Sequence, residues 1–413
     1  MADTNSDIAV VAALNSSISD DNTASDTSTL VYSQEAFETY QDRVKEIAQK
    51  TWPGLEKDHI SIERMHGGSY NRITGISFQT SESEKPQNYV LRDPRFPDLA
   101  PLTNQLAPLQ FLYNYSKLPI PKMVSFNCSN DNALARPYII QERAPGNSII
   151  HEYPEMSHQS RLTAARQLGC FYNDLTLITG NRIGKLVPFN TDLTVPWTFD
   201  VQTFIERINE SITLETGAYS SISAPDAAYQ GLLRIFKYRY DADLADPYDF
   251  RAPYDSSFIT MTKELYALGY LRNTPLTLCH LDLEVRNILV DPSNDIEPVS
   301  AILDWDSAVF APVFMACTPP MWLWAWKEGE DEDEREANEL PASTENQELK
   351  QVFEIAAGRS YMRFAYDPAY RLARRLVHFA LFGIHSAEQE EEAEEMLKEW
   401  SEVKSKSPEE RGE

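Results

Sequence analysis

Cysteine is scarce in this sequence, and the few that occur form neither a disulfide framework nor a metal site. The chain has four cysteines, none in a C-x-x-C pair and none at metal-ligand spacing from the seven histidines. We therefore predict reduced, structural cysteines in a cytoplasmic protein. Cys279 stands beside the most distinctive motif, but no base that could activate its thiol is visible, so we predict no thiol nucleophile.

Long apolar runs are also missing, which argues against a protein that spans a membrane. Residues 8–14 form a short apolar patch that follows acids instead of the basic region of a signal peptide. Residues 321–326 are rich in tryptophan, but this stretch is far too short to cross a bilayer. We predict no membrane span and interpret residues 321–326 as the start of a buried helix.

Basic residues are outnumbered, with 37 Lys and Arg against 63 Asp and Glu and a formal charge of −26. Residues 1–30 hold five acids and no base, and residues 328–336 and 388–399 each hold seven acids and one base. We interpret these runs as solvated faces. No basic stripe is available to neutralise phosphates, so we predict no nucleic-acid partner.

One segment carries most of the functional information. His280, Asp282 and Asn287 form an H-x-D-x-x-x-x-N pattern, and Asp304 follows a second apolar stretch. The pattern alone also fits a buried histidine beside a capping acid. However, residues 288–290 and 299–303 are apolar and a turn-forming cluster separates them, which predicts a hairpin that brings Asp304 to face the loop at His280.

This set of groups suits phosphoryl transfer. Asp282 can accept or orient the proton of an attacking hydroxyl, while Asn287 and Asp304 can hold Mg²⁺ on the phosphates. Positioning and charge neutralisation supply most of the rate in such reactions. Asp306 has two open interpretations: it helps to bind the metal or the acceptor, or it only caps the turn.

These residues resemble the catalytic and metal-binding residues of the aminoglycoside phosphotransferase and choline kinase group. The sequences of residues 286–290 and 302–305 are most similar to its fungal branch. The resemblance implies an α+β, two-lobed protein-kinase-like fold, with a small antiparallel N-lobe sheet and a mostly helical C-lobe. It also implies ATP and Mg²⁺ as cofactors, Asp282 as catalytic base, and His280 as a brace for the loop. We predict a disordered segment at 1–32, a nucleotide-clamping N-lobe at 33–145, a catalytic and acceptor-binding C-lobe at 146–400 and a flexible tail at 401–413.

The N-lobe can be followed along the chain. Residues 60–65 and 73–78 alternate like strands, and the turn between them holds Gly67, Gly68, Ser69 and Asn71. We favour a phosphate-covering loop, whose backbone needs glycine to approach an anion. An ordinary hairpin turn is the alternative.

A third strand at 89–92 ends in Arg92, where the family usually has a lysine that pairs the nucleotide phosphates. Gln105, in a predicted helix at 102–115, stands where an acidic partner is expected. Arginine keeps the charge but has a differently shaped fork. This pair is the main departure from the family pattern.

Residues 118–126 are typical of a loop that enters a fourth strand. Residues 136–146 are typical of a fifth strand that runs into a hinge. By the resemblance, the hinge backbone around Glu142 and Ala144 binds the adenine edge, and Gln141 lines the back of that pocket. Beyond the hinge, apolar spacing predicts helices at 157–179, within 224–271, at 370–382 with Gly383 as the stop, and from a capping box at 386–389 through Trp400.

Three hypotheses follow. The first is an ATP-dependent small-molecule kinase that transfers the γ-phosphate to a hydroxyl acceptor, and we favour it because the acid-amide-acid set is intact. The second is a catalytically degenerate nucleotide-binding protein, motivated by Arg92 and Gln105. The third is an interaction protein in which the motif is accidental. An antibiotic, an aminoalcohol, a sugar and a specialised metabolite all remain possible acceptors.

Overall fold

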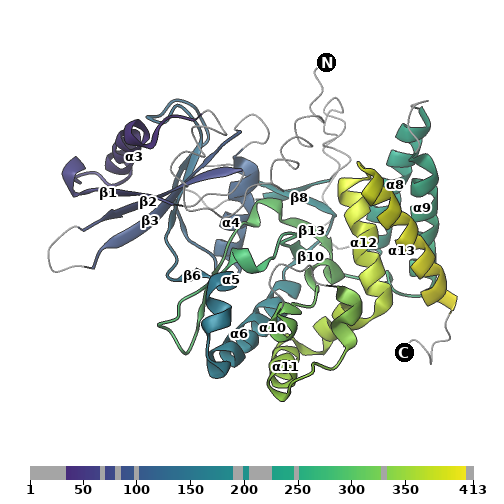
Figure 1. The fold of residues 1–413 in the computed structure, drawn as a ribbon. Coiled ribbons are helices and arrows are strands. Elements are labelled where there is room, and N and C mark those ends of the chain that lie inside the picture. Colours follow the sequence, from purple (N-terminus) through teal and green to yellow (C-terminus); the bar gives the residue numbers. More distant parts are fainter. Residues whose placement is uncertain are drawn as a thin grey trace. The chain divides into compact units, whose positions relative to one another are not determined.

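The computed structural model describes residues 34–65, 70–79, 85–96, 102–188, 199–203, 226–245, 251–326 and 333–405 (Figure 1). The chain divides into two compact units. Unit 1 comprises residues 1–109 and 121–144, and unit 2 comprises residues 110–120 and 145–413. The predicted disordered segment at 1–32 lies outside the described residues. The fold is α+β, as the sequence predicts.

Unit 1 is a five-stranded antiparallel sheet with strand order β1-β2-β3-β5-β4 and a helix, α3 (Phe37–Thr51), after which the short η1 (Lys57–His59) follows. The strands are β1 (Ser61–Arg64), β2 (Asn71–Phe78), β3 (Gln87–Pro94), β4 (Met123–Asn127) and β5 (Tyr138–Glu142). Each predicted strand is present. The prediction that Asn71 lies in the turn before β2 was wrong, because Asn71 is the first residue of that strand.

The core of unit 1 lies between α3 and one face of the sheet. Tyr40, Val44 and Ile47 from the helix pack with sheet residues such as Ile76 and Leu91. The sequence reading missed α3, although its buried side chains recur at helical spacing. Since the strand period is two, the neighbours of these sheet residues face the other way.

A buried polar cluster fastens α3 to the sheet. The side chain of Asp93 on β3 is fully buried, accepts a hydrogen bond from the Tyr40 hydroxyl at 2.6 Å, and pairs with Arg136 at 3.2 Å. Burial raises the pKa of Asp93. The Arg72 guanidinium covers the Tyr40 ring, with its carbon 3.6 Å from the ring centroid. These contacts satisfy the buried carboxyl, which would otherwise destabilise the fold.

Unit 2 contains two sheets, one of five strands in the order β7-β10-β13-β8-β9 and one of three in the order β12-β11-β6. The sequence reading missed the larger sheet, because its strands are only two to five residues long, although Phe199–Thr203 alternates apolar and polar residues. The bounds are β6 (Asn147–Ser148), β7 (Thr179–Gly180), β8 (Gly184–Pro188), β9 (Phe199–Thr203), β10 (Leu276–Cys279), β11 (Ile288–Val290), β12 (Val299–Ile302) and β13 (Val309–Pro312).

Helices make up most of the rest of unit 2. The main ones are α6 (His158–Thr176), α8 (Ala227–Ala245), α9 (Ala252–Ala267), α11 (Thr344–Tyr366), α12 (Pro368–Phe382) and α13 (Ala387–Ser405). The shorter ones are α5 (Ile149–Glu152), η2 (Tyr153–Glu155), η3 (Val285–Asn287), η4 (Trp305–Ser307), η5 (Val313–Ala316), α10 (Trp322–Ala325) and η6 (Glu334–Asn338). A further helix, α4 (Thr103–Tyr115), begins in unit 1 and ends in unit 2.

The predicted helices are present, with small shifts of their ends. Gly383 ends α12 at a φ of +80°, as expected for a glycine stop. Ser386 accepts a hydrogen bond from the Gln389 backbone, but the Gln389 side chain reaches back to the backbone of His385 instead of closing a full capping box. The last helix continues beyond Trp400 to Ser405. Residues 322–324 are buried, which confirms the short tryptophan-rich helix.

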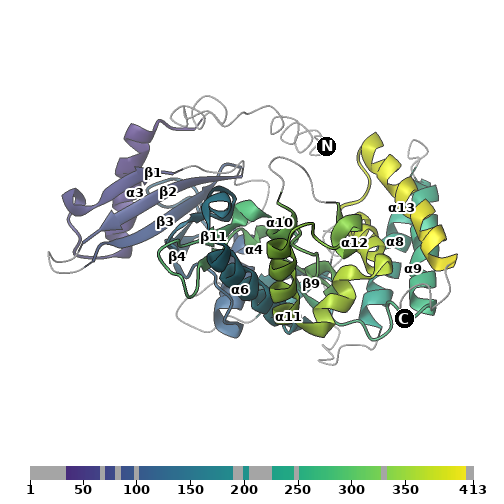
Figure 2. The same cartoon turned by 60° about the horizontal axis from the view of Figure 1, so that its bottom comes forward.

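Figures 1 and 2 both show α8, α9, α12 and α13 side by side at one end of unit 2. Another tight pair is α6 and α11, where a Cβ added to Gly169 would come within 2.6 Å of Ala356 and of the Phe353 carbonyl. The absent side chain therefore lets the two helices approach closely.

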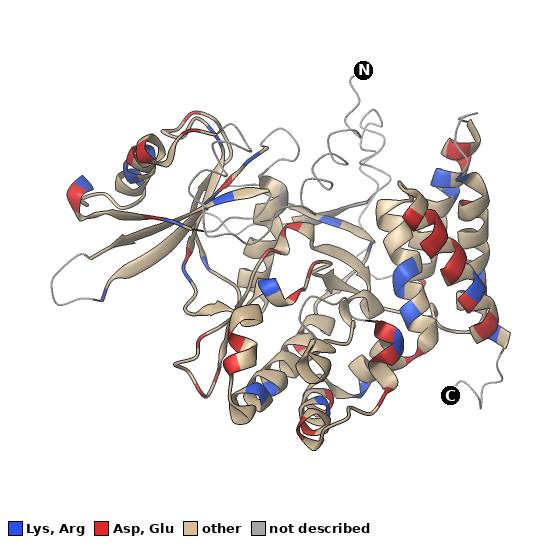
Figure 3. Cartoon of the chain, in the orientation of Figure 1, with Lys and Arg blue, Asp and Glu red and all other residues tan. Residues whose placement is uncertain are grey.

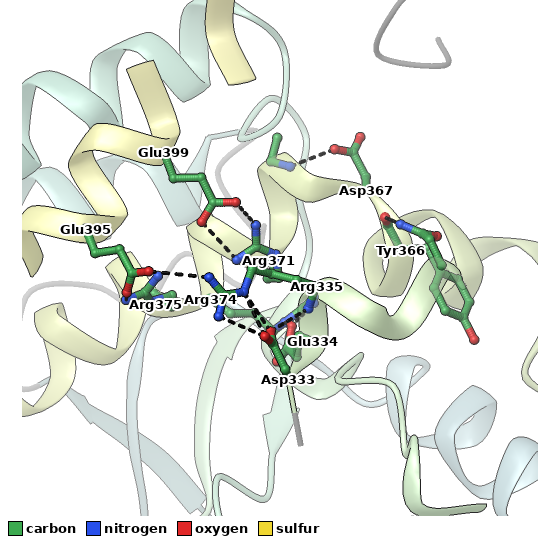
Figure 4. Close-up of polar contacts among 12 residues, drawn as sticks. Asp333, Glu334, Arg335, Tyr366, Asp367, Arg371, Arg374, Arg375, Glu395 and Glu399 are labelled. Carbon is green, nitrogen blue, oxygen red and sulfur yellow. Dashed lines mark hydrogen bonds and ion pairs between the residues drawn. The ribbon is translucent and has the colours of Figure 1, made fainter. Parts of the chain in front are cut away.

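The acids of α13 form a row along the helix (Figure 3). The prediction of simple solvated faces was only partly right. Glu399 pairs with Arg371 of α12, and Arg375 of α12 pairs with Glu392 at 3.4 Å and Glu395 at 3.6 Å (Figure 4). Three of the eight acids of this helix therefore pair with arginines of its neighbour.

Candidate active site

The candidate site is built around the loop that follows β10. His280 is only 2% exposed, and its Nε2–H donates to the Leu303 carbonyl at 2.7 Å, while its Nδ1 accepts from the Asp282 backbone N–H at 3.3 Å. One nitrogen donates and the other accepts, so the ring is neutral. Burial lowers the pKa of His280, which agrees with this state.

Leu303 joins the loop to the hairpin. Its carbonyl is held by His280, and its N–H donates to the Asn287 carbonyl at 2.8 Å. The hairpin itself pairs β11 with β12, with Ile288 opposite Ile302. Asp304 follows immediately in the left-handed conformation, at a φ of +60°. The predicted hairpin is confirmed, and it brings the residue before Asp304 against both ends of the motif.

Asp282 is held by two donors on its own loop. Its Oδ1 accepts from Arg286 Nη2 at 2.8 Å, and its Oδ2 accepts from Asn287 Nδ2 at 3.2 Å. Asn287 Nδ2 also donates to the Asp282 backbone carbonyl at 2.8 Å. Because the nitrogen of this amide is used on Asp282, its Oδ1 is the atom that remains for another ligand.

The donor chemistry here fits a magnesium ion. Asn287 would offer an amide oxygen and Asp304 a carboxylate, and Mg²⁺ prefers such hard oxygen ligands, together with water and substrate phosphates. No group of three or more His, Cys, Asp and Glu side chains suited to a metal occurs in the described part of the chain. A site of one carboxylate and one amide requires no such group. Asp306 lies nearby in η4.

In unit 1, three predicted nucleotide-binding residues share one face of the sheet. Arg92 lies opposite Ile73 and Ile139, and Asn71 and Gln141 each lie two residues along their strands from these partners. This is the face opposite α3. Gln141 is 4% exposed, and within the described ranges its Nε2 has no hydrogen-bond partner. Gly67, Gly68 and Ser69 lie outside the described residues.

The hinge segment follows Gln141. The Glu142 N–H donates to the Lys122 carbonyl at 2.8 Å, and the Arg143 N–H donates to the Asn88 carbonyl at 3.0 Å. A purine edge would therefore meet other backbone groups of the stretch that ends at Ala144. The side chain of Glu142 is exposed and lies 3.8 Å from Lys122.

Gln105 lies on α4, the helix predicted to carry a partner for Arg92. Its Oε1 is buried and accepts no hydrogen bond from the residues that the structure describes. Gln105 carries no negative charge that could pair with Arg92, and its Oε1 does not accept a hydrogen bond from Arg92.

Sequence reasoning missed three features of the site. Arg286 lies inside the motif but was not singled out, and the junction at Leu303 depends on backbone groups that no side-chain pattern reveals. Gly146, after the hinge, has a φ of +87°, and a Cβ there would lie 1.9 Å from the Val290 carbonyl. The Ala-Pro-Gly sequence before β6 was the available signal for this turn.

Two cysteines flank this region without reactive character. Cys279 and Cys317 are buried, and burial raises the pKa of each thiol. A thiol that holds its proton is a poor nucleophile.

A model of the phosphotransferase enzyme family matches residues 71–348, about two thirds of the chain. The chain belongs to this phosphotransferase enzyme family. The matched range includes every described site residue named above, from Asn71 through Asp304. The resemblance stated from the motif is therefore confirmed, and with it the protein-kinase-like fold and the class of the protein as a phosphotransferase.

Curated relatives of this phosphotransferase match only part of it. It is similar to "Altered inheritance of mitochondria protein 9, mitochondrial" of Debaryomyces hansenii, with 25% identity over 147 residues, 33% of this chain and 22% of that protein. The protein of the same name from Candida tropicalis is 26% identical over 137 residues, 30% of this chain and 21% of its own. The match thus spans about a fifth of the length of each relative.

Solved structures to which the phosphotransferase is similar include a putative aminoglycoside phosphotransferase from Ralstonia eutropha, with 14% identity, 88% of this chain and 96% of that chain covered, and a TM-score of 0.46. ADP-bound aminoglycoside phosphotransferase APH(2'')-Ib has 12% identity, coverage of 89% and 98%, and a TM-score of 0.45. Within the described ranges, no helix of the phosphotransferase is long and apolar enough to span a membrane.

Proposed function

We propose that this phosphotransferase transfers the γ-phosphoryl group of ATP to a hydroxyl of a small molecule. The observation that carries the proposal is the junction at Leu303. Its carbonyl is held by His280 and its N–H by Asn287, so the loop with Asp282 and the strand that ends at Asp304 are tied together. A fixed arrangement of this kind is what positioning catalysis requires.

In the proposed reaction, Asp282 accepts the proton of the attacking hydroxyl. The hydroxyl oxygen forms a bond to the γ-phosphorus, the bond from that phosphorus to the β-bridging oxygen breaks, and ADP leaves with the electron pair. Asn287 Oδ1 and Asp304 would hold Mg²⁺, which when bound neutralises charge on the phosphates. His280 stays neutral and braces the loop.

Unit 1 would supply the nucleotide contacts. Arg92, Asn71 and Gln141 share a sheet face, which supports their assignment to one ligand. Gly67, Gly68 and Ser69 would cover the phosphates, and backbone groups between Glu142 and Ala144 would meet the base. Arginine suits phosphate because its fork can donate two parallel hydrogen bonds.

The acceptor is proposed only as a small molecule with a hydroxyl group. Aminoglycosides, aminoalcohols and sugars form the first panel to screen. A cytoplasmic location is likewise kept as a proposal, since "mitochondrial" in the names of both relatives is said of those yeast proteins.

The test needs no acceptor: thermal unfolding with ATP plus Mg²⁺, with ATP plus a chelator, and with Asp304→Ala. Ligand at about 100 times its dissociation constant stabilises a fold by about 2.7 kcal/mol, which gives a readily measured shift. We expect a metal-dependent shift in the wild type that Asp304→Ala abolishes. An undiminished shift in the variant would place the metal elsewhere.

A non-catalytic nucleotide binder is the second candidate. Gln105 favours it, because a neutral glutamine stands where an active enzyme is expected to carry an acid, and no residue that the structure describes donates to its buried Oε1. A shift with ATP that is the same with and without chelator would support this candidate over the first.

A further inference from the structure

Arg286 is a cation within the proposed catalytic loop. Its Nη2 donates to Asp282 Oδ1 at 2.8 Å, and its Nη1 pairs with Glu284. Its side chain is 55% exposed, and its polar contacts with residues that the structure describes all lie within residues 282–286. Among those residues, Arg286 therefore connects no distant parts of the fold. An exposed ion pair of this kind contributes about 0–1 kcal/mol to stability, so stability alone gives little reason for its geometry.

The geometry does constrain Asp282. A carboxylate anchored at both oxygens, here by Arg286 and Asn287, cannot rotate freely, yet each oxygen keeps a lone pair for an incoming hydroxyl. The two anchors differ in their other duties. Asn287 is also a proposed metal ligand, whereas the described partners of Arg286 are two carboxylates of its own loop.

We propose that Arg286 is a positioning residue for the proposed base Asp282. The guanidinium fixes Asp282 Oδ1, and Glu284 occupies its second arm, so the cation stays beside Asp282. The inference rests on the proposed function, because it assumes that Asp282 receives the proton of the acceptor. The inference adds Arg286 to the proposed mechanism as a residue that acts through Asp282 and does not itself touch the reacting atoms.

The test uses the full chain and the hydrolysis of Mg-ATP, in which water replaces the unidentified acceptor and the release of ADP is followed. Arg286→Ala should lower kcat by about 100-fold, the scale expected when a reacting group is misplaced by about 1 Å. The KM for ATP should stay within about twofold, because the nucleotide contacts are untouched. The unfolding temperature should change by no more than about 2 °C.

Chemical rescue separates positioning from a structural effect. Guanidinium chloride, added below unfolding concentrations, should restore part of the activity of Arg286→Ala, and an equal concentration of sodium chloride should not. Arg286→Lys should fall between wild type and Arg286→Ala, because an ammonium keeps the charge but loses the fork. Arg335→Ala is the matched control: it removes an arginine of similar exposure, 58%, whose ion pairs with Asp333 and Glu395 lie outside the proposed catalytic loop, so activity should stay near the wild-type value.

Two failures are distinguishable. If the wild type hydrolyses ATP, Asp282→Asn abolishes that activity, and Arg286→Ala keeps the wild-type kcat, then this inference is wrong and the proposed function stands. If the wild type neither hydrolyses ATP nor shows a metal-dependent thermal shift, then the proposed function is wrong. The inference about Arg286 is then wrong as well, because it depends on that function. An Arg286→Ala loss that guanidinium cannot rescue would also overturn the positioning role.

Discussion

At the scale of single residues, the candidate site depends on backbone conformations that the side chains do not favour. Leu281 and Asp304 both have positive φ, at 63° and 60°. For a residue with a Cβ this conformation costs roughly 1–2 kcal/mol. Strain of this kind often concentrates at functional sites. Here it turns the chain at the start of the loop and again at the end of β12, where His280 and Leu303 meet.

His280 gives a prediction at the same scale. Burial lowers its pKa in the folded state below the ordinary value of about 6.5, so the unfolded chain binds the proton first as the pH falls. The stability that the neutral ring contributes is therefore complete above pH 6.5. It is lost at lower pH by up to about 1.4 kcal/mol per pH unit, until the folded pKa is reached.

The measurement is urea unfolding of wild type and His280→Gln at pH 7.5 and pH 5.5. Glutamine can still donate to the Leu303 carbonyl but does not titrate, so the stability gap between the two proteins should narrow by up to about 1.4 kcal/mol at the lower pH. An equal gap at both values would mean that His280 takes up its proton at the same pH in the folded and the unfolded chain, so that burial does not lower its pKa.

At the scale of secondary-structure elements, the chain after Pro145 is held to the hairpin of β11 and β12 by the pairing of β6 with β11. Gly146 permits this pairing, because a side chain there would collide with the Val290 carbonyl. Nothing of this is visible in hydrophobic periodicity, since β6 has two residues.

Gly146→Ala should destabilise unit 2 by more than about 2 kcal/mol, since it combines a positive φ with a backbone collision. Gly269→Ala is the matched control in the same unit: its φ is +96°, but nothing lies within 4 Å of the added Cβ. It should cost only the conformational part, about 1 kcal/mol. Equal losses of unfolding free energy in the two variants would show that the collision is relieved by a shift.

At the scale of the whole molecule, buried polar contacts between distant segments hold each unit together. In unit 1, Asp93 and Tyr40 connect the sheet to α3. In unit 2, Arg374 of α12 is 5% exposed and donates to the Phe364 carbonyl at 2.7 Å and to the Ala365 carbonyl at 3.2 Å. It also pairs with Glu334 of η6 (Figure 4). One guanidinium thus joins α11, α12 and η6.

Arg374→Met should lower the unfolding free energy by about 3 kcal/mol, because it leaves Glu334 and two carbonyls without their donor. Arg335→Met provides the control, since Arg335 also pairs with acids, Asp333 and Glu395, but its side chain is 58% exposed. That variant should change stability by less than about 1 kcal/mol. Denaturant titration of both compares them directly, and a small effect of Arg374→Met would mean that water replaces its contacts.

Local pattern was enough to predict much of this protein. Alternation located β1 and β2, helical spacing located α6 and α12, and a capping box located α13. The motif from His280 to Asp304 indicated the phosphotransferase family before any fold was known. These features are readable because the information lies within a few neighbouring residues. Other elements were missed. The helices α3 and α11 were overlooked, and the strands β6 to β10 and β13 are too short for a period to stand out, even in β9, whose five residues alternate.

Only the tertiary structure decided which residues, far apart in the sequence, contact one another. The sequence determined that the loop carries His280, Asp282 and Asn287. It did not determine that Leu303 forms backbone hydrogen bonds with His280 and with Asn287, at the two ends of that loop. It showed Arg286 without showing that it pairs with Asp282, and Gln105 without showing that its Oε1 accepts no hydrogen bond from a described residue. Hydrogen bonds between distant segments and backbone conformations at positive φ depend on how the chain closes on itself, and a linear pattern holds no record of that.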